Sequence, residues 1–166
     1  MILLAVGYHY VSASAPRSPR AIFPITVDAL AAQLELLGRA FEFVSRDELV
    51  AAAAGESTLP ERACVVTFDD GLRCQVELAL PVLERLGVPA TFFLPGLPLA
   101  EGRALFVHKV HALRERLDEQ VFLRRLRRVL EERGIDVDPV SEEDARAHYR
   151  YDPPDDLRYV RAALGL

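Results

Sequence analysis

The stretch Val65-Val66-Thr67-Phe68-Asp69-Asp70-Gly71 is a short apolar run that ends in two adjacent carboxylates and a glycine. A strand that is buried on both faces has such a continuous run of β-forming residues, without alternation of apolar and polar side chains. Two neighbouring carboxylates repel each other and are costly to desolvate, so a cation, a proton or water is expected beside them. The stretch therefore predicts a buried strand followed by a functional pair of acids or, as the alternative, by a plain solvated turn.

Further strands and helices are expected on both sides of this run. Strands are predicted at 2–6, where the strand is expected to be buried, and at 41–44 and 89–94. Helices are expected after Thr26, which can act as an N-cap, after Ser45, which can form a capping box with Glu48, and after the Asp-Asp turn. This alternation of strands and helices with short loops predicts a parallel sheet or an α/β barrel.

Prolines interrupt two of these segments. Pro81 is expected to kink the helix that follows the Asp-Asp turn unless that helix begins late. The sequence Pro95-Gly96-Leu97-Pro98 is expected to break the chain after the last strand.

The character of the chain changes near Gly102, because charged residues dominate from there on and strand signals disappear. Helices are predicted over 106–117 and around an apolar stripe of Phe122, Leu126 and Val129, and Ser141 can cap another helix. We therefore expect two parts: residues 1–102 with the strands, and residues 103–166 as a charged, helical insertion or tail.

Composition narrows the function classes. Of the 166 residues, 51% are hydrophobic and 27% are charged, which is typical of a folded globular domain. The net charge of −5 gives no reason to expect a nucleic acid partner. The first residues resemble no signal peptide and no apolar run is long enough for a membrane span, so the sequence predicts a cytoplasmic protein without a membrane partner.

The acidic pair lies where α/β proteins build their active sites, at the carboxyl end of a strand. Side chains alternate along a strand, so the carboxylates of Asp69 and Asp70 are expected to diverge. One carboxylate can then hold a divalent metal while the other accepts a proton from water, a division that suits hydrolysis. His9, at the end of the first predicted strand, is a candidate substrate-binding residue, with a structural histidine as the alternative.

Thr67-Phe68-Asp69-Asp70-Gly71 resembles the first motif of the polysaccharide deacetylases, the NodB-homology carbohydrate esterases. The opening Tyr8-His9-Tyr10-Val11 and the strand at 90–94 are similar to other elements of that family, so the resemblance covers roughly residues 1–97. It implies the N-terminal part of a distorted (β/α) barrel and a metal-dependent deacetylase whose substrate is an acetylated sugar or polysaccharide.

The resemblance also implies roles for single residues. Asp69 matches the general base of the family and Asp70 its metal ligand, with Zn²⁺ as the expected ion. Two histidines of a His-Ser/Thr-x-x-His motif normally complete the metal site, and that motif is not found in this sequence. His108 and His111 are the closest pair, at a spacing of i, i+3, and are the candidate replacements.

The missing motifs lead to the expectation that this chain is the front part of a longer deacetylase and is weakly active or inactive alone. Two alternatives stay open: an Mg-dependent phosphoryl hydrolase or transferase that uses the acidic pair, and a non-catalytic remnant that binds a partner through its helical tail. The first requires a phosphate-binding loop, of which the sequence has no sign. The second requires an exposed apolar stripe on the helix at 119–133.

Overall fold

The computed structural model describes residues 1–15 and 22–136, so the predicted cap at Ser141 lies outside the described residues. Two compact units make up the chain, the first formed by Met1–Ala104 and the second beginning at Leu105. Among the described helices, none has the length and the apolar character that crossing a membrane would require.

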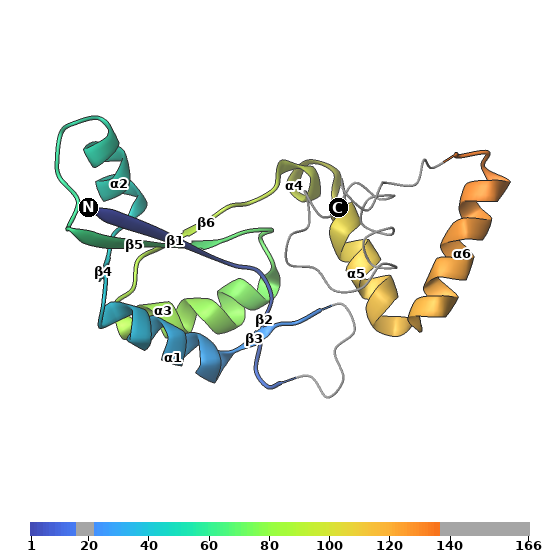
Figure 1. Ribbon diagram of the computed structural model, residues 1–166, viewed down its shortest axis with the longest axis horizontal. Coiled ribbons are helices and arrows are strands. Elements are labelled where there is room, and N and C mark those ends of the chain that lie inside the picture. Colours follow the sequence, from blue (N-terminus) through green and yellow to red (C-terminus); the bar gives the residue numbers. More distant parts are fainter. Residues whose placement is uncertain (16–21, 137–166) are drawn as a thin grey trace. The chain divides into compact units, whose positions relative to one another are not determined.

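The first unit is built on a parallel sheet whose central strand is the run before the acidic pair. This strand, β5 (Arg62–Phe68), pairs with β1 (Ile2–Tyr8) on one side and with both β4 (Glu42–Phe43) and β6 (Ala90–Phe92) on the other. All of these pairings are parallel (Figure 1), which confirms the predicted mixed α/β fold with parallel strands. A separate small pair joins β2 (Val11–Ser12) to β3 (Ile25–Thr26).

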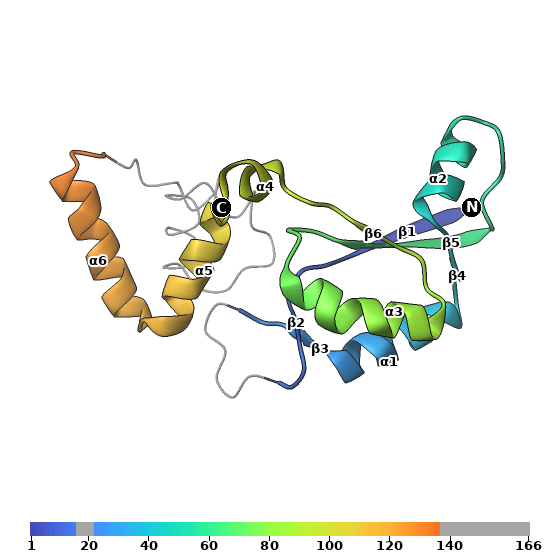
Figure 2. The same ribbon diagram turned by 180° about the vertical axis from the view of Figure 1, so that it is seen from behind.

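Helices cover the two faces of this sheet. The helices α1 (Val27–Gly38) and α3 (Leu80–Leu86) lie side by side on one face, and α2 (Arg46–Ala53) lies on the other (Figures 1 and 2). The predicted caps are confirmed: Oγ1 of Thr26 accepts from the Ala29 N–H, and Ser45 forms a capping box with Glu48. These caps satisfy backbone N–H groups that the first helical turn leaves without partners.

The sequence of β5 explains why it is central. Cys64, Val66 and Phe68 point toward the core shared with α1 and α3, while Ala63 and Val65 pack toward Leu49 of α2 and Leu59. Because apolar side chains are needed on both faces, the run is continuous, as predicted. The predicted burial of the first strand is wrong: Ile2 and Leu3 are 54% and 45% exposed, because β1 pairs only with β5 among the described strands and forms an edge.

Three rings stack across the carboxyl end of the sheet. The ring of Phe68 lies 5.3 Å from that of Tyr8 and 5.0 Å from that of Phe92, in line with the strand register. Aromatic pairs of this kind add about 0.5–1.5 kcal/mol beyond their burial. The stack holds the ends of three strands together just before His9, Asp69 and Phe93.

Two proline segments have local structure that the sequence did not indicate. The helix after the turn begins early, with a π-helical segment, η1 (Gln75–Ala79), that runs into α3. Pro81 then lies in the first turn of α3. Proline has no backbone N–H, and the wider π turn before it leaves no helical hydrogen bond that this N–H would have to donate. Residues 95–98 do not break the chain: α4 (Gly96–Glu101) forms there, because Pro98 lies in the first helical turn, where no N–H bond is needed.

The second unit contains the two predicted helices, α5 (Phe106–Arg116) and α6 (Glu119–Glu132). Phe122 and Leu123 of α6 are buried against Val110, Leu117 and Leu126. Of the apolar stripe expected on this helix, Phe122 is therefore covered within the unit, while Val129 stays 46% exposed. The partner-binding alternative requires an exposed apolar stripe, so the burial of Phe122 weakens it while the exposure of Val129 does not.

Candidate active site

The acidic pair directly follows the central strand. Asp69 continues the β1–β5 ladder, since its N–H donates to the carbonyl oxygen of Tyr8 over 3.1 Å. The next strand in the sheet ends alongside, where the N–H of Phe93 donates to the carbonyl oxygen of Phe68 over 2.8 Å. Asp69 and Asp70 therefore lie at the carboxyl edge of a parallel sheet, the usual place for an α/β active site.

The turn itself has an uncommon backbone. Asp70 has φ of 79° and Gly71 has φ of 61°, so two successive residues are left-handed. Aspartate tolerates this region better than most residues but still pays a strain cost. At Gly71 a Cβ atom would also lie 2.9 Å from Cδ2 of Leu94, so glycine suits both the backbone and the space.

His9 is the residue that the fold brings to Asp70. Nδ1 of His9 donates to Oδ2 of Asp70 over 2.8 Å, because a carboxylate can only accept. The side chain of His9 is 54% exposed and that of Asp70 is 20% exposed. This bond leaves Nε2 of a neutral His9 ring with a lone pair for another partner.

Tyr10 lies in the electrostatic range of the same turn. The pKa of its phenol is raised above 10.0, chiefly by burial and then by the charges of Asp70 and Cys74. The sequence alone predicts no role for Tyr10. Its neutral hydroxyl adds a polar group near the acidic pair.

The buried side chain of Gln75 holds the backbone of this site. Its Nε2 donates to the carbonyl oxygen of His9 over 2.9 Å and also to the carbonyl oxygen of Asp69, and its Oε1 accepts from the Leu72 N–H over 3.2 Å. Sequence reasoning missed Gln75, because a glutamine near the start of an amphipathic helix gives no signal of burial.

The metal-ligating side chains at the carboxyl edge of the sheet are of types that suit a divalent ion, but they are too few to complete a metal site. Asp70 offers a carboxylate and His9 an imidazole, whereas catalytic zinc sites use three protein ligands. Across residues 1–15 and 22–136, no group of three or more His, Cys, Asp or Glu side chains is arranged to hold a metal ion. Asp70 and His9 alone therefore fall short of a catalytic zinc site.

The other two candidate ligands belong to the second unit. His108 and His111 both lie on α5, at the predicted spacing of i, i+3, and both side chains are half-buried. Their assignment as metal ligands stays a prediction, as do the roles predicted for Asp69, Asp70 and His9.

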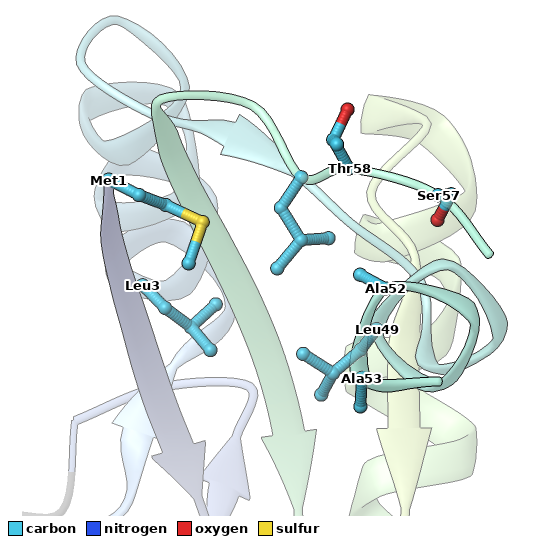
Figure 3. Close-up of a pocket in the computed structure, with 8 residues that line it drawn as sticks. Met1, Leu3, Leu49, Ala52, Ala53, Ser57 and Thr58 are labelled. Carbon is cyan, nitrogen blue, oxygen red and sulfur yellow. The ribbon is translucent and has the colours of Figure 1, made fainter. Parts of the chain in front are cut away.

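A separate apolar cavity of about 400 Å³ lies far from the acidic pair. Side chains of β1, α2 and the segment before β5 surround it, among them Met1, Leu3 and Leu49 (Figure 3). Met1 and Leu3 lie at the amino end of β1 and Leu59 precedes β5, whereas the acids follow the carboxyl end of β5. The cavity is therefore no part of the candidate active site.

The family model for polysaccharide deacetylase matches residues 56–120, which include β5, the acidic pair, α3 and β6. The resemblance to the polysaccharide deacetylases is confirmed over this stretch. No curated protein matches the chain.

Three solved structures are similar to parts of the chain. A de-N-acetylase from Aggregatibacter actinomycetemcomitans is 30% identical over 54% of this chain and 36% of that chain, with a TM-score of 0.49. IcaB from Ammonifex degensii is 32% identical over 55% and 37%, with a TM-score of 0.48. The Streptococcus pyogenes deacetylase PplD, in complex with acetate, is 20% identical over 68% and 52%, with a TM-score of 0.49. The chain thus spans between 36% and 52% of the length of these proteins.

Proposed function

We propose that the Asp69–Asp70 turn belongs to the active site of a metal-dependent deacetylase that removes acetyl groups from a sugar or polysaccharide. The observation that carries the proposal is the pair of acids at the carboxyl edge of a parallel sheet, within residues 56–120, which match the family model. His9, which lies outside that stretch, is bonded to Asp70. Residues 1–102 are then the front part of a distorted (β/α) barrel, and residues 103–166 a helical insertion.

The two acids would divide the work. Asp69 is the proton acceptor: it takes a proton from water as the oxygen of that water attacks the acetyl carbon. The bond from carbon to the sugar nitrogen or oxygen then breaks, and the leaving group takes up a proton, which yields acetate and the free amine or hydroxyl. A general base of this kind contributes on the order of 10²–10⁴-fold to the rate.

Asp70 would hold the divalent ion, with Zn²⁺ as the first choice for a site of carboxylate and imidazole donors. Such an ion would supply Lewis-acid chemistry there: it would polarise the acetyl carbonyl and lower the pKa of a water molecule. His108 and His111 of α5 stay the predicted further ligands. We expect the chain alone to bind zinc weakly and to have little deacetylase activity.

An assay of two products separates this function from phosphoryl chemistry. Acetate release from acetylated chito-oligosaccharides and phosphate release from a generic phosphate ester are measured with the full chain, Zn²⁺ or Mg²⁺, and an Asp69→Asn control. The proposal expects any activity to be acetate release that Asp69→Asn abolishes. Phosphate release that depends on Asp69 would contradict it, as would acetate release that Asp69→Asn leaves intact.

A further inference from the structure

Gln75 is the one polar or charged side chain that is fully buried in the described part of the chain. Burying an amide without partners costs roughly 1–3 kcal/mol, so a buried glutamine needs a compensating set of hydrogen bonds. Gln75 has three of them, two from Nε2 and one to Oε1. A carboxamide has two donor hydrogens and two acceptor lone pairs, so both donors are used.

The partners of Gln75 come from three segments that carry the candidate site. The carbonyl oxygen of His9 lies just after β1, that of Asp69 just after β5, and the N–H of Leu72 just after the acidic turn. One nitrogen atom, Nε2, thus joins the backbone of His9 to the backbone of Asp69. The side chain of His9 bonds Asp70, and Asp69 directly precedes Asp70 in the chain.

The turn needs such a restraint. A left-handed conformation at a residue other than glycine, as at Asp70, persists where surrounding contacts over-determine it. Gln75 begins a π-helical segment, and π turns inside helices are frequent at functional sites. In this chain the π turn follows directly on the acidic loop, with the Gln75 carboxamide in contact with the backbone on both sides of it.

We propose that Gln75 is a positioning residue for the acidic pair. Its carboxamide fixes the backbone at His9 and Asp69, and through them it sets the contact of 2.8 Å between His9 and Asp70. Gln75 contacts no substrate in this role. The catalytic meaning of the inference rests on the proposed deacetylase function, but the geometric relationship does not.

A purely structural role makes a different prediction. If Gln75 only stabilises the start of its helix, the bond from Leu72 N–H to Oε1 is the one that matters. Gln75→Glu separates the two roles, because glutamate keeps the length and the acceptor for Leu72 but has at most one donor in place of two. Gln33→Glu is the matched control, since Oε1 of the exposed Gln33 only accepts, from the Tyr8 hydroxyl.

The readout is the ¹⁵N spectrum of the His9 ring in the metal-free full chain, assigned with a His9→Gln variant. We expect Gln75→Glu to move the His9 ring signals toward those of Asp70→Asn, while Gln33→Glu leaves them unchanged. A folded Gln75→Glu variant with unaltered His9 signals would overturn the proposal, because the imidazole would then keep its place without both donors.

A measurement on the unmodified chain keeps the test decisive if Gln75→Glu does not fold. The side-chain amide hydrogens of Gln75 should exchange with solvent at least about tenfold more slowly than those of Gln33, since bonded and buried groups exchange only on opening. Equal exchange rates would contradict the proposal. Acetate release is assayed separately. If Asp69→Asn leaves acetate release intact while the His9 ring signals still depend on Gln75, only the proposed function is refuted.

Discussion

Nδ1 of His9 and Oδ2 of Asp70 lie 2.8 Å apart although 61 positions separate the two residues in the chain. The register of β1 and β5 explains this, because Tyr8 is paired with Phe68 and the residues just beyond each strand therefore meet. Since the His9 side chain is 54% exposed, this contact serves geometry more than stability.

The exposure of this pair gives a first prediction. We expect His9→Gln to change the free energy of unfolding by less than about 1 kcal/mol, because water competes for a polar contact whose His9 side is more than half exposed. Urea unfolding of the two chains, followed by circular dichroism, measures the difference. A loss of several kcal/mol would mean that the contact is part of the folding core.

The carboxylate that the proposed function needs at position 70 stands on a left-handed backbone that lowers stability. Asp70→Gly relieves the left-handed strain that Asp70→Ala retains, so the glycine variant should be more stable than the alanine variant by about 1 kcal/mol. Both variants lose the carboxylate. Thermal and urea unfolding of the two variants test this, and equal stabilities would show that the turn relaxes when the carboxylate is removed.

Helix α1 offers a matched pair of leucines for the packing of the core. Leu30 is fully buried and Leu36 is 63% exposed on the same helix. Leu30→Ala should lower the free energy of unfolding by about 2–5 kcal/mol, through lost burial and the cavity left behind. Leu36→Ala should change it by less than about 0.5 kcal/mol. Similar losses of stability at the two positions would mean that α1 packs on the sheet with a face other than the one that carries Leu30.

Alkaline pH should destabilise the first unit through its buried phenols. Burial, and then the charge of Cys64, raise the pKa of Tyr8 above 10.0, and the pKa of Tyr10 is raised as well. A raised pKa means that the folded state holds the proton more tightly, so this stability is complete below pH 10.0 and is lost as the pH rises through the folded pKa.

Tyrosinate absorbance and unfolding free energy, measured across this range, test the alkaline effect. Tyr8→Phe should reduce the pH dependence, because phenylalanine keeps the ring stack with Phe68 and has no phenol to ionise. The same pH dependence in Tyr8→Phe would assign the effect to other groups.

The strand pattern was predictable because it depends on local sequence. The run Val65–Phe68 must be apolar on both faces of the central strand, and the caps at Thr26 and Ser45 depend on residues three positions away. The edge position of β1 was not predictable, because its strand pairing, and not its own sequence, decides its exposure.

The candidate site was only partly predictable for a similar reason. Asp69 and Asp70 were found as a local pattern at the end of a strand. The bond between His9 and Asp70 and the buried position of Gln75 depend on the register of strands far apart in sequence and on a π turn, for which a single sequence gives no signal.

Zinc binding is the measurement that tests the division of roles between the two acids most directly. Zn²⁺ is titrated into the full chain by calorimetry and compared with Asp70→Asn and Asp69→Asn, two identical chemical changes at neighbouring residues. We predict weak binding that Asp70→Asn abolishes and Asp69→Asn retains. Binding that survives Asp70→Asn, or that Asp69→Asn removes as completely, would contradict the proposal that Asp70 holds the metal and Asp69 takes the proton.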